Sequence, residues 1–235
     1  MNIKALVITN TYPTQDNPGD TPCIKDQLDE LIEKGVEIKL FHIDRRKKIN
    51  YIKTAWRVFT LSFRKKQYDI IHAYYGHSGL IARLQFKYPI ITTFRGSDLL
   101  SAKDGIIGRL IINRIDAAVV MTEEMKRVSK RDDVYIIPFG VNKKIFKPYS
   151  KKLARRELGL PLKKKLILFP WNPSRPVKRF DIVQEVFEQL LEKYAVDIVT
   201  VFDKPPKTVS KYMNACDVMI LASNHEGSPM AVREA

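Results

Sequence analysis

The stretch Ala117-Ala118-Val119-Val120-Met121 is an apolar run in which polar and apolar side chains do not alternate. Such a run is typical of a strand buried on both faces of a parallel sheet. Working outward from it, similar runs alternate with amphipathic stretches. The expected strands are 3–9, 36–42, 69–73, 89–93, 116–121 and 133–137, and the expected helices are 21–34, 51–66, 77–86, 104–113 and 123–130. This alternation predicts right-handed strand–helix–strand units and hence an open, doubly wound α/β sheet.

The pattern starts again in the second half of the chain. A turn-rich segment, Pro138-Phe139-Gly140-Val141-Asn142, is followed by a basic stretch that runs from Lys143 to Lys165. The elements expected after it are a strand at 166–169, a helix at 178–194, a strand at 196–202, a helix at 206–214 and a strand at 217–222. We therefore predict two Rossmann-like parallel-sheet domains, residues 1–150 and residues 151–235. The second has only three strands and an unfinished sheet edge, so we expect it to be incomplete.

The composition indicates a globular protein in a reducing compartment. Of 235 residues, 45% are hydrophobic and 10% aromatic, which is enough to build a core and excludes a disordered chain. Cys23 and Cys216 are far apart and have no metal-like spacing. The first residues are typical of a strand rather than a signal peptide, and no apolar run reaches the ~18–20 residues of a spanning helix. We expect a cytoplasmic location, either free or peripheral on the cytoplasmic membrane face.

The charge is strongly positive, with 41 Lys and Arg against 26 Asp and Glu, a net charge of +15. Such an excess favours anionic partners. The expected helix at 51–66 lies among basic residues and carries an apolar stripe with helical spacing. The stripe consists of Ile52, Ala55, Trp56, Phe59 and Phe63. We favour it as the core-facing side of the helix. The alternative is a helix that lies in an anionic membrane interface, and Val58 and Leu61 broaden the apolar arc enough for both roles.

Polar residues of the first domain follow two of the expected strands. In open α/β sheets the ligand crevice lies at the carboxyl ends of the strands. The loop after strand 3–9 carries Gly19, which could let a ligand approach the backbone or could be an ordinary turn residue. The loop after strand 89–93 carries Arg95 and Asp98. The guanidinium of Arg95 could bind phosphate or carboxylate, and a surface ion pair with Asp98 is the alternative.

The end of the chain combines a turn with two glutamates, in the segment from His225 to Ala235. Ser228 suits the N-cap and Pro229 the first position of a helix, so we expect a helix to begin there. The N-terminus of a helix favours an anion. Glu226 before the helix and Glu234 on its second turn would flank this anion site, and their carboxylates can accept hydrogen bonds from hydroxyl groups.

A basic cluster follows the first strand of the second domain. Arg175, Lys178 and Arg179 lie at a strand-to-helix transition, where cations would help to neutralise a diphosphate. The alternative is a solvated loop. The histidines show no metal-binding spacing, and the sequence has no pair of CxxC motifs and no Asp-x-Asp. They are His42, His72, His77 and His225. We expect no metal ion and no organic cofactor.

These motifs together resemble the family-4 retaining glycosyltransferases of the GT-B fold. The most specific element is Glu226 followed after seven residues by Glu234, and the segment 137–148 is similar to the interdomain segment of the family. The resemblance implies that the second domain binds a nucleotide-diphosphate sugar and that the first binds mostly the acceptor. Family members continue past the second glutamate, so it also implies a C-terminally truncated second domain.

The resemblance implies roles for single residues. Glu226 would bind hydroxyls of the transferred sugar, Glu234 those of the ribose, and Lys178 the diphosphate. The other implied donor-binding residues are Gly227, Ser228, Gly19 and Arg175. Arg95 stands where the family often has a histidine that contacts the sugar, so we expect it in the catalytic set with Glu226 and Lys178. Asp98 and His77 are expected on the acceptor side. No arginine stands at Asn172 or Pro173, where the resemblance would place a phosphate-binding one.

The implied reaction transfers a sugar from a nucleotide-diphosphate donor to a hydroxyl acceptor, with retention of configuration. It belongs to the biosynthesis of glycans, polysaccharides or lipid-linked glycans. The expected partners are the donor, a glycan or lipid-linked acceptor and an anionic membrane surface, with no nucleic acid. Two alternatives stay open: a non-catalytic basic α/β module that binds anionic membrane or nucleic acid, and an inactive remnant of a truncated enzyme.

Overall fold

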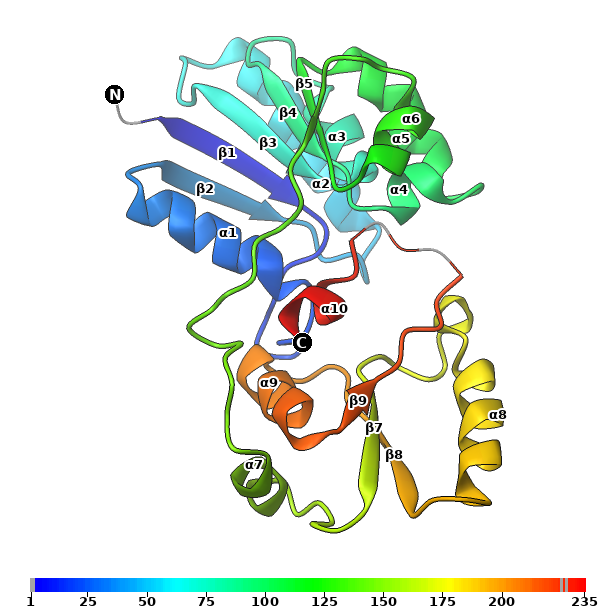
Figure 1. Cartoon of the computed structure of the whole chain (residues 1–235). Coiled ribbons are helices and arrows are strands. Elements are labelled where there is room, and N and C mark those ends of the chain that lie inside the picture. Colours follow the sequence, from blue (N-terminus) through cyan, green and yellow to red (C-terminus); the bar gives the residue numbers. More distant parts are fainter. Residues whose placement is uncertain (1–2, 225, 227) are drawn as a thin grey trace. The chain divides into compact units, whose positions relative to one another are not determined.

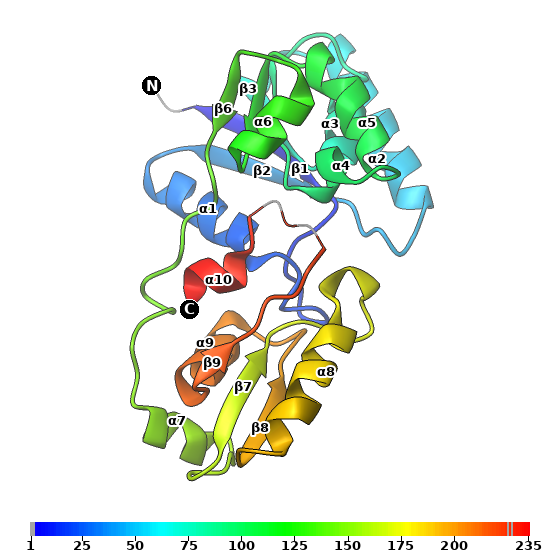
Figure 2. The same cartoon turned by 45° about the vertical axis from the view of Figure 1, so that its right-hand side comes forward.

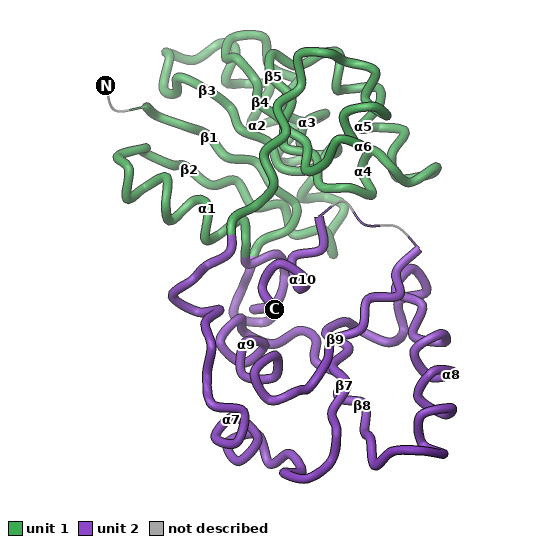
Figure 3. Tube along the Cα trace, in the orientation of Figure 1, with its two compact units in different colours: residues 1–12, 23–140 green, residues 13–22, 141–235 purple. Residues whose placement is uncertain are grey.

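A computed structural model describes residues 3–224, 226 and 228–235 of the chain (Figure 1). The chain divides into two compact units (Figure 3). Unit 1 comprises Met1–Tyr12 and Cys23–Gly140, and unit 2 comprises Pro13–Pro22 and Val141–Ala235. Along the described ranges, the chain therefore passes between the units three times. The last passage, between Gly140 and Val141, lies in the turn-rich segment that separates the two halves of the sequence pattern.

Unit 1 is built on a parallel sheet with the strand order β2-β1-β3-β4-β5-β6 within the described residues. The strands are β1 (Lys4–Thr9), β2 (Glu37–His42), β3 (Ile70–Tyr74), β4 (Ile90–Thr93), β5 (Ala117–Val120) and β6 (Val134–Ile136). In register, Leu6 pairs with Ile71, and Ile71 with Ile90. The side chains of Leu6, Ile71 and Val120 are completely or almost completely buried, as expected for strands covered on both faces. The predicted parallel α/β sheet is confirmed.

Helices connect these strands by crossovers. They are α1 (Pro22–Glu33), α2 (Ile49–Thr60) with η1 (Leu61–Phe63), α3 (Gly76–Ala82), α4 (Ser97–Leu100), α5 (Gly105–Ile111) with η2 (Ile112–Arg114), and α6 (Glu123–Ser129). From β1 to β2 the chain moves one way across the sheet, and from β2 to β3 it moves the other way. Right-handed crossovers then put α1 on one face and α2 and α3 on the opposite face, and Figure 1 shows α1 in front of the sheet with α2 and α3 behind it.

The side of helix α2 that faces the core is not the predicted aromatic side. Its buried residues are Thr54 and Val58, followed by Leu61 in η1. These positions are spaced i, i+4 and i+7, so they form one narrow stripe of small and aliphatic side chains that can approach the rest of the unit closely. The bulkier Trp56 and Phe63 are exposed. The prediction that the aromatic stripe faces the core is therefore wrong.

Unit 2 has a second parallel sheet, of order β8-β7-β9 among the described residues. Its elements are α7 (Lys151–Glu157), β7 (Lys165–Phe169), η3 (Pro176–Lys178), α8 (Phe180–Leu191), β8 (Val196–Thr200), α9 (Pro206–Ala215), β9 (Val218–Met219) and α10 (Met230–Glu234). Helices α8 and α9 flank the sheet on opposite sides (Figure 2). The core includes Leu166, Leu168, Val201 and Cys216. The predicted strand at 217–222 is reduced to Val218–Met219, which pairs with Ile167 and Leu168 of β7.

An ion-pair network joins α7 to this sheet. Arg155 is buried and donates from Nε to the Ala215 carbonyl and from Nη2 to Asp217 Oδ2, both at 2.8 Å. The same carboxylate accepts from the Leu166 N–H at 2.8 Å and, through Oδ1, from Lys151 Nζ at 2.8 Å. Asp217 thus binds α7, the first residues of β7 and the start of β9 together.

Candidate functional site

The strand order of unit 2 places two loops side by side at one end of the sheet. Strand β7 lies between β8 and β9, so the chain leaves β7 toward one neighbour and returns on its other side. At such a switch point the loops that follow two adjacent strands run to opposite faces of the sheet. In open α/β sheets, ligands bind in the crevice between such loops. The loop after β7 runs to η3 and the loop after β9 runs to α10. Lys178 is the last residue of η3, and the loop after β9 carries Glu226.

Lys178 and Glu226 form an ion pair across this switch point, although they are far apart in the sequence. Lys178 Nζ donates to Glu226 Oε1, and the ammonium group lies 4.7 Å from the centroid of the Trp171 ring. The Lys178 side chain is 8% exposed and that of Glu226 is 23% exposed. Burial lowers the pKa of Lys178, and the hydrogen bond and charge of Glu226 oppose this effect. The ion pair is thus largely shielded from solvent. A polar ligand can reach it at the more exposed Glu226 carboxylate.

The loop around Lys178 has a defined backbone conformation. Arg179 adopts a left-handed conformation with φ of 52°, between the end of η3 and the start of α8. Its guanidinium binds Asp181 and donates from Nη1 to Asn224 Oδ1 at 3.3 Å, and the Asn224 N–H donates to the Val177 carbonyl at 3.1 Å. The two crevice loops are therefore tied together. The side chain of Arg175 is exposed at the beginning of η3.

The glutamate-containing turn differs in one detail from the prediction. Helix α10 begins at Met230, and Pro229 rather than Ser228 occupies the N-cap position, without a side-chain hydrogen bond. The expected cap by Ser228 is therefore wrong: proline takes the extended conformation just before the helix, and Ser228 lies one position too early to cap it. Glu234 is the last residue of α10 and is half-buried. Gly227 lies outside the described residues.

Gly19 belongs to the segment of unit 2 that lies early in the sequence. A Cβ atom at Gly19 would lie 3.0 Å from the Asp203 Cα and 3.3 Å from the Lys204 backbone nitrogen. The missing side chain therefore allows backbone to pack on backbone within unit 2. Whether a ligand also approaches Gly19 stays a prediction.

In unit 1, Asp98 organises the loops after β3 and β4. Its carboxylate is fully buried. Oδ1 accepts from the N–H groups of Arg95 at 2.8 Å and Gly96 at 3.0 Å, and Oδ2 accepts from the Gly76 N–H at 3.0 Å. Burial raises the pKa of Asp98, and these three hydrogen bonds act in the opposite direction. The surface ion pair considered as an alternative is not formed, since this carboxylate has no exposure to solvent.

Arg95 and His77 lie at the same edge of the unit 1 sheet, after β4 and β3. Arg95 Nη1 donates to Thr11 Oγ1 at 3.2 Å, and its guanidinium carbon lies 5.6 Å from the centroid of the Phe139 ring. The His77 ring stacks on Tyr75 at 5.8 Å between centroids. Tyr75 has φ of 79°, a costly conformation for a residue with a side chain. Such local strain at the carboxyl end of a strand is typical of binding loops.

Sequence reasoning missed four residues of these crevices: Thr11, Tyr75, Ser97 and Trp171. The Tyr75 and Ser97 hydroxyls lie 2.9 Å apart, and Trp171 covers the Lys178 ammonium. Each follows closely after a strand of its sheet, and that position alone could have identified them. Their residue types gave no signal, because none of them is a charged group that by itself indicates a binding site.

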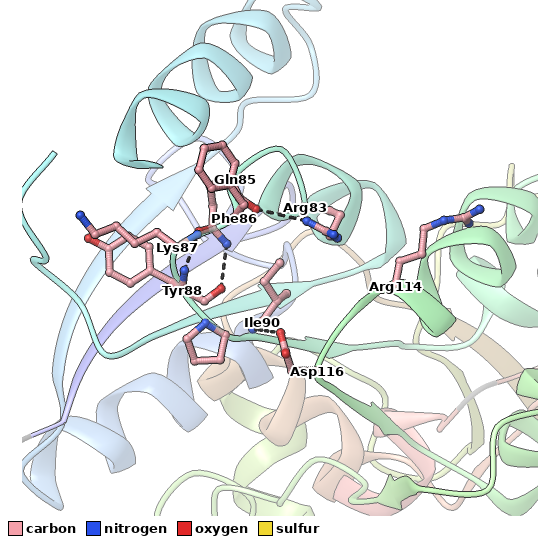
Figure 4. A pocket seen from close by; sticks show the side chains of 9 residues that line it. Arg83, Gln85, Phe86, Lys87, Tyr88, Ile90, Arg114 and Asp116 are labelled. Atoms are coloured by element: carbon pink, nitrogen blue, oxygen red, sulfur yellow. Dashed lines mark hydrogen bonds between the residues drawn. The ribbon is translucent and has the colours of Figure 1, made fainter. Parts of the chain in front are cut away.

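A pocket of about 410 Å³ lies at the opposite end of the unit 1 sheet (Figure 4). It is lined by the loop before β4 and by Arg114 and Asp116 just before β5. It contains none of the predicted site residues. Within residues 3–224, 226 and 228–235, no three His, Cys, Asp or Glu side chains are grouped so that they could hold a metal ion. Over that same part of the chain, every helix is too short or too polar to cross a bilayer.

Comparisons with known proteins give a family for this chain. Residues 4–144 match Glycosyltransferase Family 4. The chain is 23% identical to the teichuronic acid biosynthesis glycosyltransferase TuaC of Bacillus subtilis (strain 168), over 99% of this chain and 78% of that protein. It is 27% identical to a D-inositol 3-phosphate glycosyltransferase of Acidothermus cellulolyticus, over 54% of this chain and 33% of that one.

Solved structures agree with this match at the level of the fold. Sucrose-phosphate synthase from Thermosynechococcus elongatus superposes with a TM-score of 0.74 at 18% identity, covering 100% of this chain and 78% of that one. Anabaena HepE, solved in complex with UDP-glucose, superposes with a TM-score of 0.57 at 13% identity, covering 96% and 75% of the two chains. The family match spans more than half of the sequence, and the chain therefore belongs to glycosyltransferase family 4 and has the GT-B fold of nucleotide-sugar glycosyltransferases.

Proposed function

We propose that the protein transfers a hexose from a uridine-diphosphate sugar to a hydroxyl group, with retention of configuration, during the synthesis of a polysaccharide or a lipid-linked glycan. The observation that carries the proposal is the shielded Lys178–Glu226 pair at the switch point of the second sheet. Family membership, a relative named for teichuronic acid biosynthesis and a structural neighbour solved with UDP-glucose support it.

The Lys178 ammonium would stabilise the negative charge that develops on the departing diphosphate. A preorganised charge in a shielded site does this without reorganising solvent. The Trp171 ring and the Glu226 carboxylate both contact the ammonium group and hold it in place. The exposed Arg175 is the second cation that could reach the diphosphate. These cations supply positive charge from side chains, so the proposal requires no metal ion.

Glu226 would accept hydrogen bonds from hydroxyls of the transferred sugar and orient Lys178 at the same time. A carboxylate has several acceptor positions, so a bond to Lys178 leaves others available. We assign Glu234 to the ribose and the loop of Gly227 and Ser228 to the diphosphate. In unit 1, Arg95 would face the transferred sugar, and His77 would contact the acceptor. We assign Asp98 a positioning role, because its carboxylate holds the loop that carries Arg95.

The donor assignment is tested by a thermal-shift panel of UDP-glucose, UDP-N-acetylglucosamine and GDP-mannose, followed by an assay of nucleoside-diphosphate release. Lys178→Ala and Glu226→Ala should lower turnover about 10²–10³-fold, the usual effect of removing one preorganised group from a transition state. The matched control Glu185→Gln changes an exposed carboxylate on α8 and should keep full activity. Turnover that is unchanged in Glu226→Ala contradicts the assigned role.

The stereochemical proposal has its own test. Proton NMR of the first product formed should show the same anomeric configuration as the donor sugar. An inverted product disproves retention and leaves the donor assignment intact, because donor binding is measured separately by the thermal shift.

A further inference from the structure

Unit 1 exposes a row of apolar side chains along α2, η1 and the loop before β4. The row consists of Ile52, Trp56, Phe59, Phe63 and Phe86, and we call it the aromatic strip. Trp56, Phe63 and Phe86 are 68%, 70% and 69% exposed. The rings follow one another at 6.0 Å from Trp56 to Phe59, 5.3 Å from Phe59 to Phe63 and 5.9 Å from Phe63 to Phe86. The strip is therefore one continuous apolar ridge, and a ridge of this kind marks an interaction site.

The charged side chains of the segment that carries α2 and η1 are all basic. Residues 45–68 contain no Asp or Glu, and all of their basic side chains are exposed: Arg45, Arg46, Lys47, Lys48, Lys53, Arg57, Arg64, Lys65 and Lys66. Two acidic residues flank the segment, Asp44, which binds Arg46, and Asp69, which lies 3.7 Å from Lys66. The basic charge thus exceeds the nearby acidic charge by a wide margin.

Positive charge continues beyond the end of the strip. Phe86 lines the pocket at the start of β4 together with Arg83, Lys87 and Arg114 (Figure 4). The one carboxylate among its lining residues is that of Asp116. It accepts a hydrogen bond from the backbone N–H of Ile90 at 2.8 Å. This hollow next to an apolar ridge is suited to an anionic group whose neighbouring atoms are apolar.

We propose that α2, η1 and Phe86 form a docking surface for an anionic lipid bilayer. The aromatic strip would enter the boundary between headgroups and acyl chains, and the surrounding lysines and arginines would contact lipid phosphates. A helix with aromatic residues on one side and lysine and arginine beside them is the usual form of a segment that lies in a membrane interface. With twelve residues, α2 extends over ~18 Å and carries Ile52, Trp56 and Phe59 of the strip.

Charge complementarity favours this occupant over a second copy of the chain. Two copies that met through the aromatic strip would bring two basic rims together, and like charges in an interface oppose association. A nucleic acid would use the basic residues but would leave the ridge of Ile52, Phe59 and Phe63 in water unless single-stranded bases stacked on it. An anionic bilayer satisfies both the apolar and the basic part.

Vesicle flotation tests the proposal with the full-length chain. We expect binding to vesicles of phosphatidylcholine with phosphatidylglycerol and at least tenfold weaker binding to phosphatidylcholine alone, since each basic residue near an anionic surface adds attraction. Trp56→Ser/Phe63→Ser should weaken binding to the mixed vesicles about tenfold or more. The matched control Leu191→Ser/Tyr194→Ser removes apolar side chains of similar exposure from unit 2 and should bind as the wild type does.

The basic part is tested in the same assay. Arg64→Glu/Lys65→Glu should lower vesicle binding about tenfold or more, because two attractive charges become repulsive. Lys152→Glu/Lys163→Glu makes the same change of net charge on exposed residues of unit 2 and should have little effect. If both charge variants weaken binding equally, the attraction is a property of the net charge and the proposed surface is wrong.

Tryptophan fluorescence locates the contact. The chain has two tryptophans, Trp56 in the aromatic strip and Trp171 in unit 2. Mixed vesicles should shift the emission to shorter wavelength, and brominated acyl chains should quench it; Trp56→Phe should remove both effects. Quenching that persists in Trp56→Phe overturns the proposal. So does a concentration-dependent dimer that Trp56→Ser/Phe63→Ser dissociates, or binding to single-stranded RNA that outcompetes the mixed vesicles.

Discussion

Lys178 is subject to two opposing influences on its pKa. Burial lowers the pKa, and the hydrogen bond and negative charge of Glu226 raise it. The ammonium form is the one that can bind a diphosphate, so Glu226 extends the pH range over which the site carries its charge. Under the proposed function, this coupling gives Glu226 a use beside Lys178 although carboxylate and phosphate repel one another.

Replacement of Glu226 by Gln should lower the pKa of Lys178 further, because the amide is similar in size but carries no charge. Binding of UDP should then be lost at a lower alkaline pH than in the wild type. Isothermal titration of UDP at a series of pH values above neutrality measures this shift, and Glu185→Gln is the control. Equal midpoints in the two proteins would show that the charge of Glu226 does not govern Lys178.

Asp98 is a second residue whose replacement should lower the stability of unit 1. Three backbone N–H groups donate to its buried carboxylate. Asp98→Ala would leave them without this acceptor, and each buried unsatisfied donor costs about 1–3 kcal/mol. We expect a loss of about 3 kcal/mol or more in the free energy of unfolding, measured with urea. The exposed Asp132→Ala is the control, and a loss no larger than that of the control would refute the positioning role.

At the scale of elements, the carboxylate of Asp217 joins α7, β7 and β9. Burial alone would raise its pKa, but the hydrogen bonds from Lys151 and the Leu166 N–H, with the charges of Lys151 and Arg155, bring it to about 2. The pKa in the folded state is thus below that of the unfolded chain. The carboxylate therefore stabilises unit 2 at neutral pH, and this stabilisation is lost as the pH falls from about 4 to 2.

Asp217→Asn should lower the stability of unit 2 by about 2–4 kcal/mol at pH 7, because it also leaves the buried Arg155 without its ionic partner. The variant should lose less additional stability than the wild type between about pH 4 and pH 2. Thermal unfolding across this range measures both effects. Asp197→Asn, which affects only an exposed pair with Lys164, should behave as the wild type does. If the difference in stability between Asp217→Asn and the wild type did not change between about pH 4 and pH 2, the stabilising role of the Asp217 carboxylate would be contradicted.

The sequence predicted the strands of unit 1 well, because a buried parallel strand such as β1 is a continuous apolar run. It failed where tertiary packing decides between several options. The side of α2 that faces the core could not be found from periodicity, since two apolar stripes exist and the stripe with Val58 packs more closely. Likewise β9 is shorter than its apolar run, since only Val218 and Met219 pair with β7.

The candidate site was predictable to a similar degree. Lys178 and Glu226 were found because each follows a strand of the same sheet, but their direct ion pair depends on the switch point between β7 and β9. The burial of Asp98 was not predictable, since its partners are backbone groups that carry no sequence signal. Helix α7 was also missed, because the basic stretch hides the cap that Ser150 provides by accepting from the Leu153 N–H.

At the scale of the whole molecule, the segment Pro13–Pro22 is a part of unit 2 that the sequence places inside unit 1. Gly19→Val should disturb the packing of this segment, because the new side chain would meet the Asp203 backbone and overpacking costs about 1–3 kcal/mol. Hydrogen exchange of residues 13–22 should become faster. Gly140→Val is the control, since a Cβ at Gly140 has no neighbour within 4 Å. Unchanged exchange in Gly19→Val would refute the packing role.

The discontinuous make-up of unit 2 has a consequence for recombination between family members. A single crossover near Gly140 joins the loop of residues 13–22 from one parent to the remainder of unit 2 from the other. In such a hybrid, the packing contact between Gly19 and Asp203 joins residues from two different parents. A chimera that exchanges unit 2 intact has to transfer two gene segments, a short early one and a long late one.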